Sequence, residues 1–369
     1  MKSKIEIAAM PTLEKQTQRH TVEYAPASPA TARRIPALDF TKGALVLIMV
    51  LYHWLNYFYS APGDVYKYLR FLTPSFIFIA GFLVSNVYLS KYSVSDSRLP
   101  RRLCWRGLKI LGVFAALNLA RTIMVPRASR DQLFAQHSSL KSLLDIYVIG
   151  ANLGGGQAKA VAFYVLVPIA YLLVLSSLLV LLTRVYRYAF HAMFAAFLLC
   201  VLLLDTYGTA SSNLQLITIG ILGVVAGYVP IERITKLVRH PFLLLASYAG
   251  YLAAITFWNV VYPLQIVGVC LSLMVIYLVG DAGGNRQNKV YEVVVLLGKY
   301  SLVGYIVQIA VLQALHQGIR HFDVDVQNNV ALVASFLAAS VLTILSVAAT
   351  DWARHRSTAV NRIYGTVFA

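Results

Sequence analysis

Long apolar runs recur along this chain from residue 40 almost to the C-terminus, and short polar stretches separate them. A helix needs about 20 predominantly apolar residues to cross the hydrocarbon core of a bilayer. The runs approach that length, although the fifth and sixth are shorter, and they predict about ten membrane spans. The predicted spans lie near residues 40–59, 69–90, 106–125, 160–182, 190–204, 213–229, 242–260, 263–280, 292–314 and 330–350. The pattern therefore predicts an all-α, polytopic integral membrane protein.

The composition and the charge distribution fit this prediction. Hydrophobic residues make up 59% of the chain and charged residues 13%, and the mean hydropathy is +0.67. Soluble domains carry about 25% charged residues. Cytoplasmic loops are enriched in Lys and Arg, and most of the 32 basic residues fall on the cytoplasmic side if both termini are cytoplasmic. The net charge of +17 therefore indicates topology and attraction to membrane lipids, not a nucleic acid partner.

Two parts of the chain differ in composition. Residues 1–34 are polar and contain no apolar run, which predicts a disordered cytoplasmic tail rather than a cleaved signal peptide. Residues 35–369 are expected to form one transmembrane domain. The longest outward loop, 126–159, contains the glycines 154–156, which we interpret as a hinge before the fourth span. The three cysteines lack ligand-like spacing, and we predict neither a disulfide nor a metal site.

The first predicted span contains a charged cluster at its start and a histidine, His53, deep inside it. The spacing from Asp39 to His53 corresponds to about 21 Å along a helix, which is most of a bilayer core. An imidazole in hydrocarbon is costly, so its presence requires a partner or a reaction. His53 is therefore a candidate functional residue, and Asn56, one helical turn later, lies on roughly the same face.

Four segments of the chain carry characteristic motifs, at residues 34–53, 73–82, 101–109 and 297–308. The first sets the spacing from Asp39 to His53, the second is rich in phenylalanine and contains a glycine, and the third is strongly basic. All four resemble motifs of the membrane-bound acyltransferase 3 family, which often has a histidine where the fourth has Gln308. The chain departs from many members in three ways: Lys42 replaces an arginine, Ala80-Gly81 replaces serine-glycine, and the proline common after the basic motif is absent. These departures make the chain more similar to the periplasmic glucan succinyltransferase and heparan-glucosaminide acetyltransferase branches.

The resemblance implies a function that composition and spacing alone do not. Members of this family transfer a short acyl group, typically from acyl-CoA, to a hydroxyl or amine of a glycan beyond the membrane. The resemblance therefore implies an O-acyltransferase of the bacterial cytoplasmic (inner) membrane. Its expected co-substrate is acetyl-CoA or succinyl-CoA, and its expected acceptor is an extracytoplasmic glycan or glycolipid.

The chemistry of the first span suggests how such a reaction proceeds. Acyl transfer to a hydroxyl needs a base for the acceptor proton, and imidazole is the most suitable base near neutral pH. We therefore predict that His53 is catalytic and that Asn56 orients either His53 or the acceptor sugar. The alternative is that His53 hydrogen-bonds a neighbouring helix and has no further role.

Basic residues at the start of the third span are candidates for binding the phosphates of CoA. Arg102, Arg106 and Lys109 are spaced by four and three positions, so they share one helix face. The apolar stretch 110–114 follows directly, which places Arg106 and Lys109 deeper than membrane anchoring requires. Lys42 is expected to contribute to the same site.

Further polar residues are expected to support the site, namely Asp39, Arg34, Ser301, Tyr305 and Gln308. Asp39 is predicted to cap the first helix or to pair with Arg34, Lys42 or Arg102. Glutamines within a span more often link helices than bind ligands. Two other classes of function stay open, a secondary transporter or lipid-linked glycan flippase and a non-enzymatic membrane partner. We find no internal repeat of the kind that transporters built from inverted halves contain.

Overall fold

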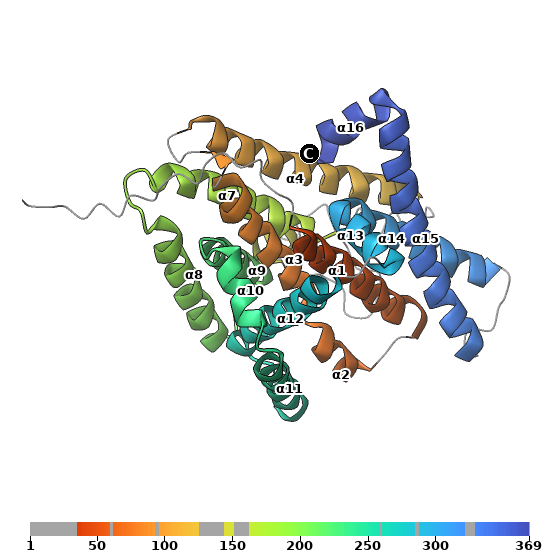
Figure 1. Cartoon of the computed structure of the whole chain (residues 1–369), viewed down its shortest axis with the longest axis horizontal. Coiled ribbons are helices and arrows are strands. Elements are labelled where there is room, and N and C mark those ends of the chain that lie inside the picture. The colour runs from red at the N-terminus through yellow and green to blue at the C-terminus, as the bar shows by residue number, and fades with distance from the viewer. Residues whose placement is uncertain are drawn as a thin grey trace, which may run out of the picture.

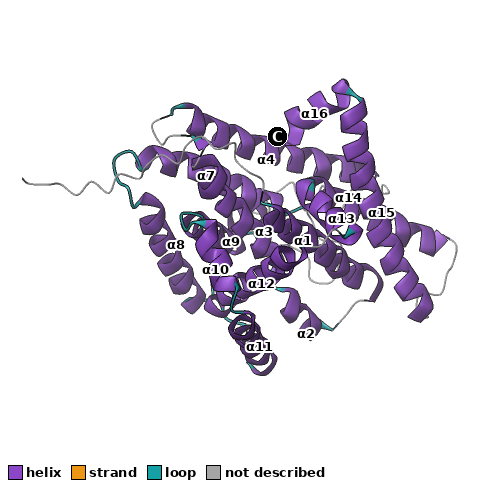
Figure 2. Cartoon of the chain, viewed as in Figure 1, coloured by secondary structure: helices purple, strands orange, loops and turns teal. Residues whose placement is uncertain are grey.

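The computed structural model describes residues 35–59, 62–89, 91–92, 96–124, 144–150, 162–258, 260–284, 288–321 and 329–368. Helices make up the regular structure within these ranges (Figure 1), and no strand occurs among them (Figure 2). The all-α prediction is therefore confirmed. The predicted tail 1–34, which includes Arg34, and the glycines 154–156 lie outside the described residues.

Most of the helices are long and apolar. In chain order the elements are α1 (Pro36–Trp54), η1 (Leu55–Tyr59), α2 (Gly63–Tyr66), η2 (Lys67–Leu69), α3 (Leu72–Leu83), η3 (Val84–Leu89), α4 (Arg98–Met124), η4 (Asp145–Ile149), α7 (Leu166–Leu182), α8 (Ala189–Thr206), α9 (Ser212–Ala226), α10 (Ile231–Val238), α11 (Pro241–Phe257), α12 (Tyr262–Gly283), α13 (Lys289–Lys299), α14 (Ser301–His321), α15 (Asn329–Arg356) and α16 (Thr358–Phe368). Two π-helical turns, η1 and η3, continue α1 and α3 and lengthen them into candidate membrane spans.

Among the described residues, seven helices or continued helices are long and apolar enough to cross a membrane. They are Pro36–Tyr59, Gly63–Leu89, Arg98–Arg121, Ala189–Thr206, Tyr262–Gly283, Ser301–Ile319 and Asn329–Arg356. α9 and α10 add an eighth if they count as one span, although they are bent by 99°. α7 and α11 are apolar but shorter. The polytopic membrane architecture is therefore confirmed, whereas ten spans and cytoplasmic termini stay predictions.

The ninth predicted span is divided in the structure. The sequence predicts one helix over 292–314, but α13 ends at Lys299 and α14 begins at Ser301. Tyr300 lies between them, with its side chain buried and its hydroxyl bonded to Asp351 on α15. This anchored tyrosine holds the break, and α14 alone forms the candidate span. The prediction of a continuous ninth helix is wrong because hydropathy does not register such an anchor.

Glycines allow α13 to lie against α1. A Cβ atom at Gly298 would overlap the carbonyl oxygen of Asp39, and Gly43 approaches the backbone of α13 equally closely. Small residues permit this close approach between helices in membrane proteins. The same device brings α3 against α9, where a Cβ atom at Gly81 would overlap the carbonyl oxygen of Gly220. Both contacts fix the position of a helix next to the candidate site.

α1 occupies the centre of the helix arrangement (Figure 1). It contacts α3, α12, α13, α14 and α15, and its residues Leu45 and Val50 are fully buried. α4 lies along α7, and the last helix, α16, packs against α4 (Figure 1). The central helix therefore carries the candidate residues Asp39, Lys42 and His53 through the middle of the bundle.

Candidate functional site

The predicted site residues of α1 lie at its two ends. Asp39 and Lys42 lie near the start of the helix, and His53 lies in its last turn. Further charged residues gather near the start of α1, and we call this region the basic end. It is defined by Asp39, Lys42, Arg102, Arg106, Lys299, Asp351 and Arg354. The structure therefore keeps His53 apart from the predicted donor-binding residues, as the spacing along the helix requires.

At the basic end, Asp39 pairs with Lys42 one turn later. The carboxylate oxygen lies 2.5 Å from the ammonium nitrogen, and the side chains are only 13% and 17% exposed. Ile35 occupies the position that caps the helix and makes no side-chain hydrogen bond there. The predicted pairing of Asp39 with Lys42 is therefore confirmed, whereas helix capping by Asp39 is wrong because α1 already begins at Pro36.

Two arginines of α4 lie on tyrosine rings. Arg102 donates a hydrogen bond to the Tyr92 hydroxyl, and its guanidinium lies 4.9 Å from the centre of that ring. Arg106 lies 5.3 Å from the centre of the Tyr88 ring on η3. The rings restrict where the guanidinium groups lie, while a guanidinium has five N–H donors to offer. Arg102 is exposed, and both Arg106 and Lys109 are half-buried.

A second charged cluster at the basic end joins α13, α15 and α16. Lys299 and the Tyr300 hydroxyl donate to the same carboxylate oxygen of Asp351, at 2.9 and 2.5 Å. Arg354 donates to the Tyr300 hydroxyl at 3.1 Å, and its guanidinium lies 3.8 Å from the centre of the Tyr364 ring. Tyr364 belongs to α16, so the cluster ties the last helix to the bundle.

Sequence reasoning missed this second cluster. Its available signal was Asp351, an acidic residue near the end of the last apolar run, because an ionised side chain at that depth requires partners. The partners of Asp351 are Lys299, at the end of α13, and Tyr300, directly after it. They lie 52 and 51 positions earlier in the chain. Local spacing therefore gives no indication of which residues they are.

At the opposite end of α1, the half-buried His53 is the first ring in a row of three aromatic side chains. The His53 ring meets the Tyr52 ring edge to face, with centres 5.2 Å apart, and Tyr52 meets Tyr66 in the same way at 5.7 Å. Tyr66 belongs to α2, so the row links the end of α1 to the segment before α3. It places His53 next to a tyrosine that borders a cavity.

Asn56 and a second histidine, His316, lie in the same region. Asn56 is exposed, and its side-chain amide donates to the carbonyl oxygen of Tyr52 at 2.9 Å, within its own helix. His316 on α14 is half-buried, and its ring centre lies 5.8 and 5.7 Å from two aromatic rings of η1. Sequence reasoning missed His316, although an imidazole in an apolar run is the signal that singled out His53.

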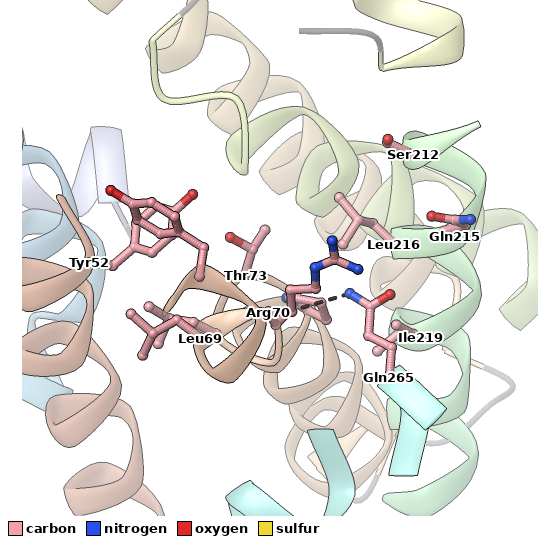
Figure 3. A pocket seen from close by; sticks show the side chains of 12 residues that line it. Tyr52, Leu69, Arg70, Thr73, Ser212, Gln215, Leu216, Ile219 and Gln265 are labelled. Atoms are coloured by element: carbon pink, nitrogen blue, oxygen red, sulfur yellow. Dashed lines mark hydrogen bonds between the residues drawn. The ribbon is translucent and has the colours of Figure 1, made fainter. Parts of the chain in front are cut away.

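A cavity of about 310 Å³ lies at this end of the bundle (Figure 3). Its polar lining includes Tyr52, Tyr66, Arg70, Ser212, Gln215 and Gln265. We call the region defined by these six residues the cavity end. Hydroxyl groups, carboxamides and one guanidinium around an aliphatic floor are typical of a site for a small polar ligand.

The cavity is built from four long helices and the short segment between two of them. α1, the α2–η2 segment, α3, α9 and α12 all contribute to the wall. Gln265 on α12 donates to the carbonyl oxygen of Arg70 at 3.4 Å, which joins two of these elements (Figure 3). Sequence reasoning missed the cavity. The sequence does contain a glutamine in each of two apolar runs, Gln215 and Gln265, and such residues indicate a site. That both line the same cavity, however, depends on how α9 and α12 pack.

The supporting residues predicted on the ninth span lie on α14. Ser301 is half-buried, and Tyr305 is buried against two phenylalanine rings, with centres 6.4 and 6.1 Å away. Gln308 is fully buried, and neither atom of its amide group has a hydrogen-bond partner among the described residues. No hydrogen bond from the Gln308 side chain to another helix therefore occurs among the described residues. Gln313 makes such a link by donating to the Tyr57 hydroxyl at 3.3 Å.

Other features offer less for acyl transfer. Within the described ranges, no group of three or more His, Cys, Asp or Glu residues is placed to hold a metal ion. A second hollow of about 430 Å³ lies between α14 and α15, and its lining is aliphatic except for Ser346. It contains no titratable side chain, so the cavity beside Tyr52 is the better candidate for an acceptor site.

The comparisons with known proteins give one match. The family described as Acyltransferase domain matches residues 35–351. The matched range begins one residue before α1 and ends at Asp351 on α15, so it includes the cavity end and most of the basic end. No curated protein and no solved structure shows a significant match to this chain.

Proposed function

The chain belongs to this acyltransferase family, and we propose that it moves an acetyl or succinyl group from cytoplasmic acyl-CoA to an extracytoplasmic glycan or glycolipid. The acceptor group is a hydroxyl or an amine, the general base is His53, and the enzyme lies in the bacterial cytoplasmic membrane. One observation carries the proposal. A single central helix has cationic side chains around its start and, at its end, a cavity lined by Tyr52, whose ring meets the His53 ring.

The basic end suits the donor. Acyl-CoA carries several phosphate charges, and charge-assisted hydrogen bonds from arginine are the strongest that a protein offers to phosphate. In this proposal Arg102 and Arg106, supported by their tyrosine rings, bind the phosphates together with Lys109. Lys42 is already paired with Asp39, so its main role is to hold the start of α1 in place.

The cavity end suits the acceptor and the chemical step. The His53 imidazole takes the proton of the acceptor hydroxyl while the acceptor oxygen forms a bond to the thioester carbonyl carbon. The bond between that carbon and the sulfur then breaks, the CoA thiolate leaves with the electron pair, and the imidazolium returns the proton to it. Because about 21 Å of helix separates Asp39 from His53, either the thioester arm reaches across part of the membrane or an acyl intermediate is passed on, and direct transfer needs fewer steps.

The test of this proposal is the replacement of His53 in protein reconstituted in proteoliposomes with labelled acyl-CoA and a glucan oligosaccharide. His53→Ala is expected to lower turnover by about a hundredfold to ten-thousandfold, while acyl-CoA affinity measured by calorimetry changes little. His53→Gln is expected to be equally poor, since glutamine does not accept a proton near neutral pH. His316→Gln, which changes another half-buried histidine of the same region, is the matched control and should retain activity.

The competing interpretations give different results. Full activity of His53→Gln would remove His53 from the mechanism, and a purely structural histidine predicts that Ala lowers the melting temperature while Gln does not. Glycan flux without any dependence on CoA would identify a transporter. For the proposed base, the wild-type rate should rise with pH through the imidazole titration, because only the neutral ring accepts a proton.

A further inference from the structure

The cavity end contains a cation that the transfer step does not use. Arg70 lies between η2 and α3, and its guanidinium projects toward the α9 wall, beside Leu216 (Figure 3). Among the described residues that line the cavity, Arg70 is the only charged one, and none is acidic. The cavity therefore presents a positive potential to any ligand that enters it.

Arg70 is not neutralised by a carboxylate within the described part of the chain. The nearby Asp64 pairs instead with Lys67, at 3.8 Å, and Lys67 also donates to the carbonyl oxygen of Thr256. Arg70 is held through its backbone, because its carbonyl oxygen accepts the hydrogen bond from Gln265. Its N–H groups are thus available to a ligand, and its backbone is fixed.

The remaining walls suit a sugar. The rings of Tyr52 and Tyr66 meet edge to face with centres 5.7 Å apart, and aromatic rings of this kind pack against the apolar faces of sugars. Ser212 and Gln215 offer neutral hydrogen-bonding groups for hydroxyls. The volume of about 310 Å³ is near the lower limit of ligand sites, about 300 Å³, so it suits a terminal sugar rather than a long chain.

We infer that the cavity selects an acceptor saccharide that carries a negative charge on its sugar, either a carboxylate or a phosphate. Arg70 receives that charge, because the planar guanidinium matches both groups with two parallel hydrogen bonds. The tyrosines and amides receive the rest of the ring. This inference rests on the proposed function in one respect, namely that the cavity is the acceptor site.

The experiment compares two probes that differ only in charge. They are 4-methylumbelliferyl β-glucuronide and the corresponding β-glucoside, titrated into the full chain purified in detergent and followed by calorimetry at low salt. The wild type is expected to bind the glucuronide about tenfold more tightly than the glucoside, since one exposed charge-assisted contact is involved. Arg70→Gln should abolish this difference without weakening the glucoside.

Lys67 provides the matched control, because it lies one turn before Arg70 but does not line the cavity. Lys67→Gln should leave both affinities unchanged. Equal binding of the two probes to the wild type would overturn the inference, and so would an equal loss of glucuronide binding in Lys67→Gln and Arg70→Gln. The latter result would indicate a general surface potential instead of a site.

Two further measurements separate this inference from lipid binding and from the proposed function. Nanodiscs with phosphatidylglycerol or with phosphatidylcholine test for a lipid headgroup. If phosphatidylglycerol alone displaces the glucuronide, and this displacement depends on Arg70, the saccharide assignment is overturned.

Acylation of the probes by labelled acyl-CoA tests the proposed function. If glucuronide binding depends on Arg70 but no acyl group is transferred, the anionic site stands and the proposed function fails. If both probes are acylated equally in wild type and in Arg70→Gln, the proposed function stands and this inference fails.

Discussion

The two ends of α1 use charge in opposite ways. At the basic end, the carboxylates of Asp39 and Asp351 each accept from a lysine, and the arginines lie on tyrosine rings. At the cavity end, Arg70 faces a cavity whose described lining contains no acid. Paired charges cost desolvation and are costly to break, and the pair of Lys299 with Asp351 joins α13 to α15. An unpaired cation contributes little to folding and is available to a ligand.

The difference also suggests how tightly and how selectively each end binds its ligand. A guanidinium that stacks on a ring is restricted before the ligand arrives, which reduces the entropy lost on binding. Arg102 and Arg106 are restricted in this way, whereas no aromatic ring of the described residues stacks on the Arg70 guanidinium. The basic end therefore suits tight binding of a large polyanionic donor, and the cavity end suits selection among acceptors.

The largest effect is expected from moving α13 away from α1 at the basic end. In Gly298→Ala the new Cβ atom overlaps the carbonyl oxygen of Asp39, and a helix backbone yields less easily than a side chain. We expect a loss of stability of about 3 kcal/mol, with a lower melting temperature and weaker acyl-CoA binding. Binding of the glucoside probe at the cavity end should change less.

A glycine without such a neighbour gives the control. In Gly318→Ala on α14, the added atom meets no atom of the described residues within 4 Å, so the substitution should be neutral or stabilising by up to about 1 kcal/mol. Thermal unfolding of both variants in the same detergent measures the contrast. Equal melting temperatures for the two variants would show that the close contact of α13 with α1 does not hold the basic end together.

The next largest effect concerns the donor. Replacing Arg106 and Lys109 together with Gln should weaken acyl-CoA binding by about a hundredfold, since each charge-assisted phosphate contact contributes about 1.5 kcal/mol or more. Arg101→Gln, an exposed position on the same helix, should have little effect. Calorimetry at low salt checks both. Unchanged affinity in the double variant would return these residues to a role in membrane anchoring.

A smaller effect is expected at the cluster that holds α16. Asp351→Asn removes the charge that Lys299 and Tyr300 share, but the lysine and aspartate side chains are 26% and 24% exposed, so solvent screens the pair. We expect a loss of about 1 kcal/mol, measured by thermal unfolding. Asp64→Asn at the cavity end is the control, because Asp64 is 92% exposed and its loss should not change stability. If the two variants melt alike, the pairing at the basic end contributes nothing to stability.

Local features of the fold could be predicted from the sequence. Helix formation in a membrane protein depends on runs of apolar residues, and the run predicted at 263–280 becomes α12 (Tyr262–Gly283). The divided ninth span could not be predicted in this way. At that break Tyr300 bonds to Asp351, which lies in a distant part of the chain. Hydropathy records how apolar a segment is, not where a side chain anchors it.

The same division applies to the candidate site. The pair of Asp39 and Lys42 follows from helical spacing, so sequence reasoning found it. The cavity brings together Tyr52, Arg70 and Gln265 from three separate elements, and their common direction is set by packing. No periodicity within one helix contains that information. Asn56 illustrates the same limit, because helical spacing predicts a shared face with His53 but not the hydrogen bond to Tyr52 that the side chain makes.

The smallest effect is therefore expected at Asn56, which the sequence places with His53 as catalytic. Its amide donates to the Tyr52 carbonyl oxygen of its own helix at 2.9 Å and is exposed. Asn56→Ala should change stability by no more than about 0.5 kcal/mol and turnover by no more than about twofold. Kinetics in proteoliposomes with labelled acyl-CoA check this, in wild type and in His53→Ala. A tenfold fall in turnover that disappears in the His53→Ala background would show that Asn56 acts through the imidazole, because coupled residues are not additive.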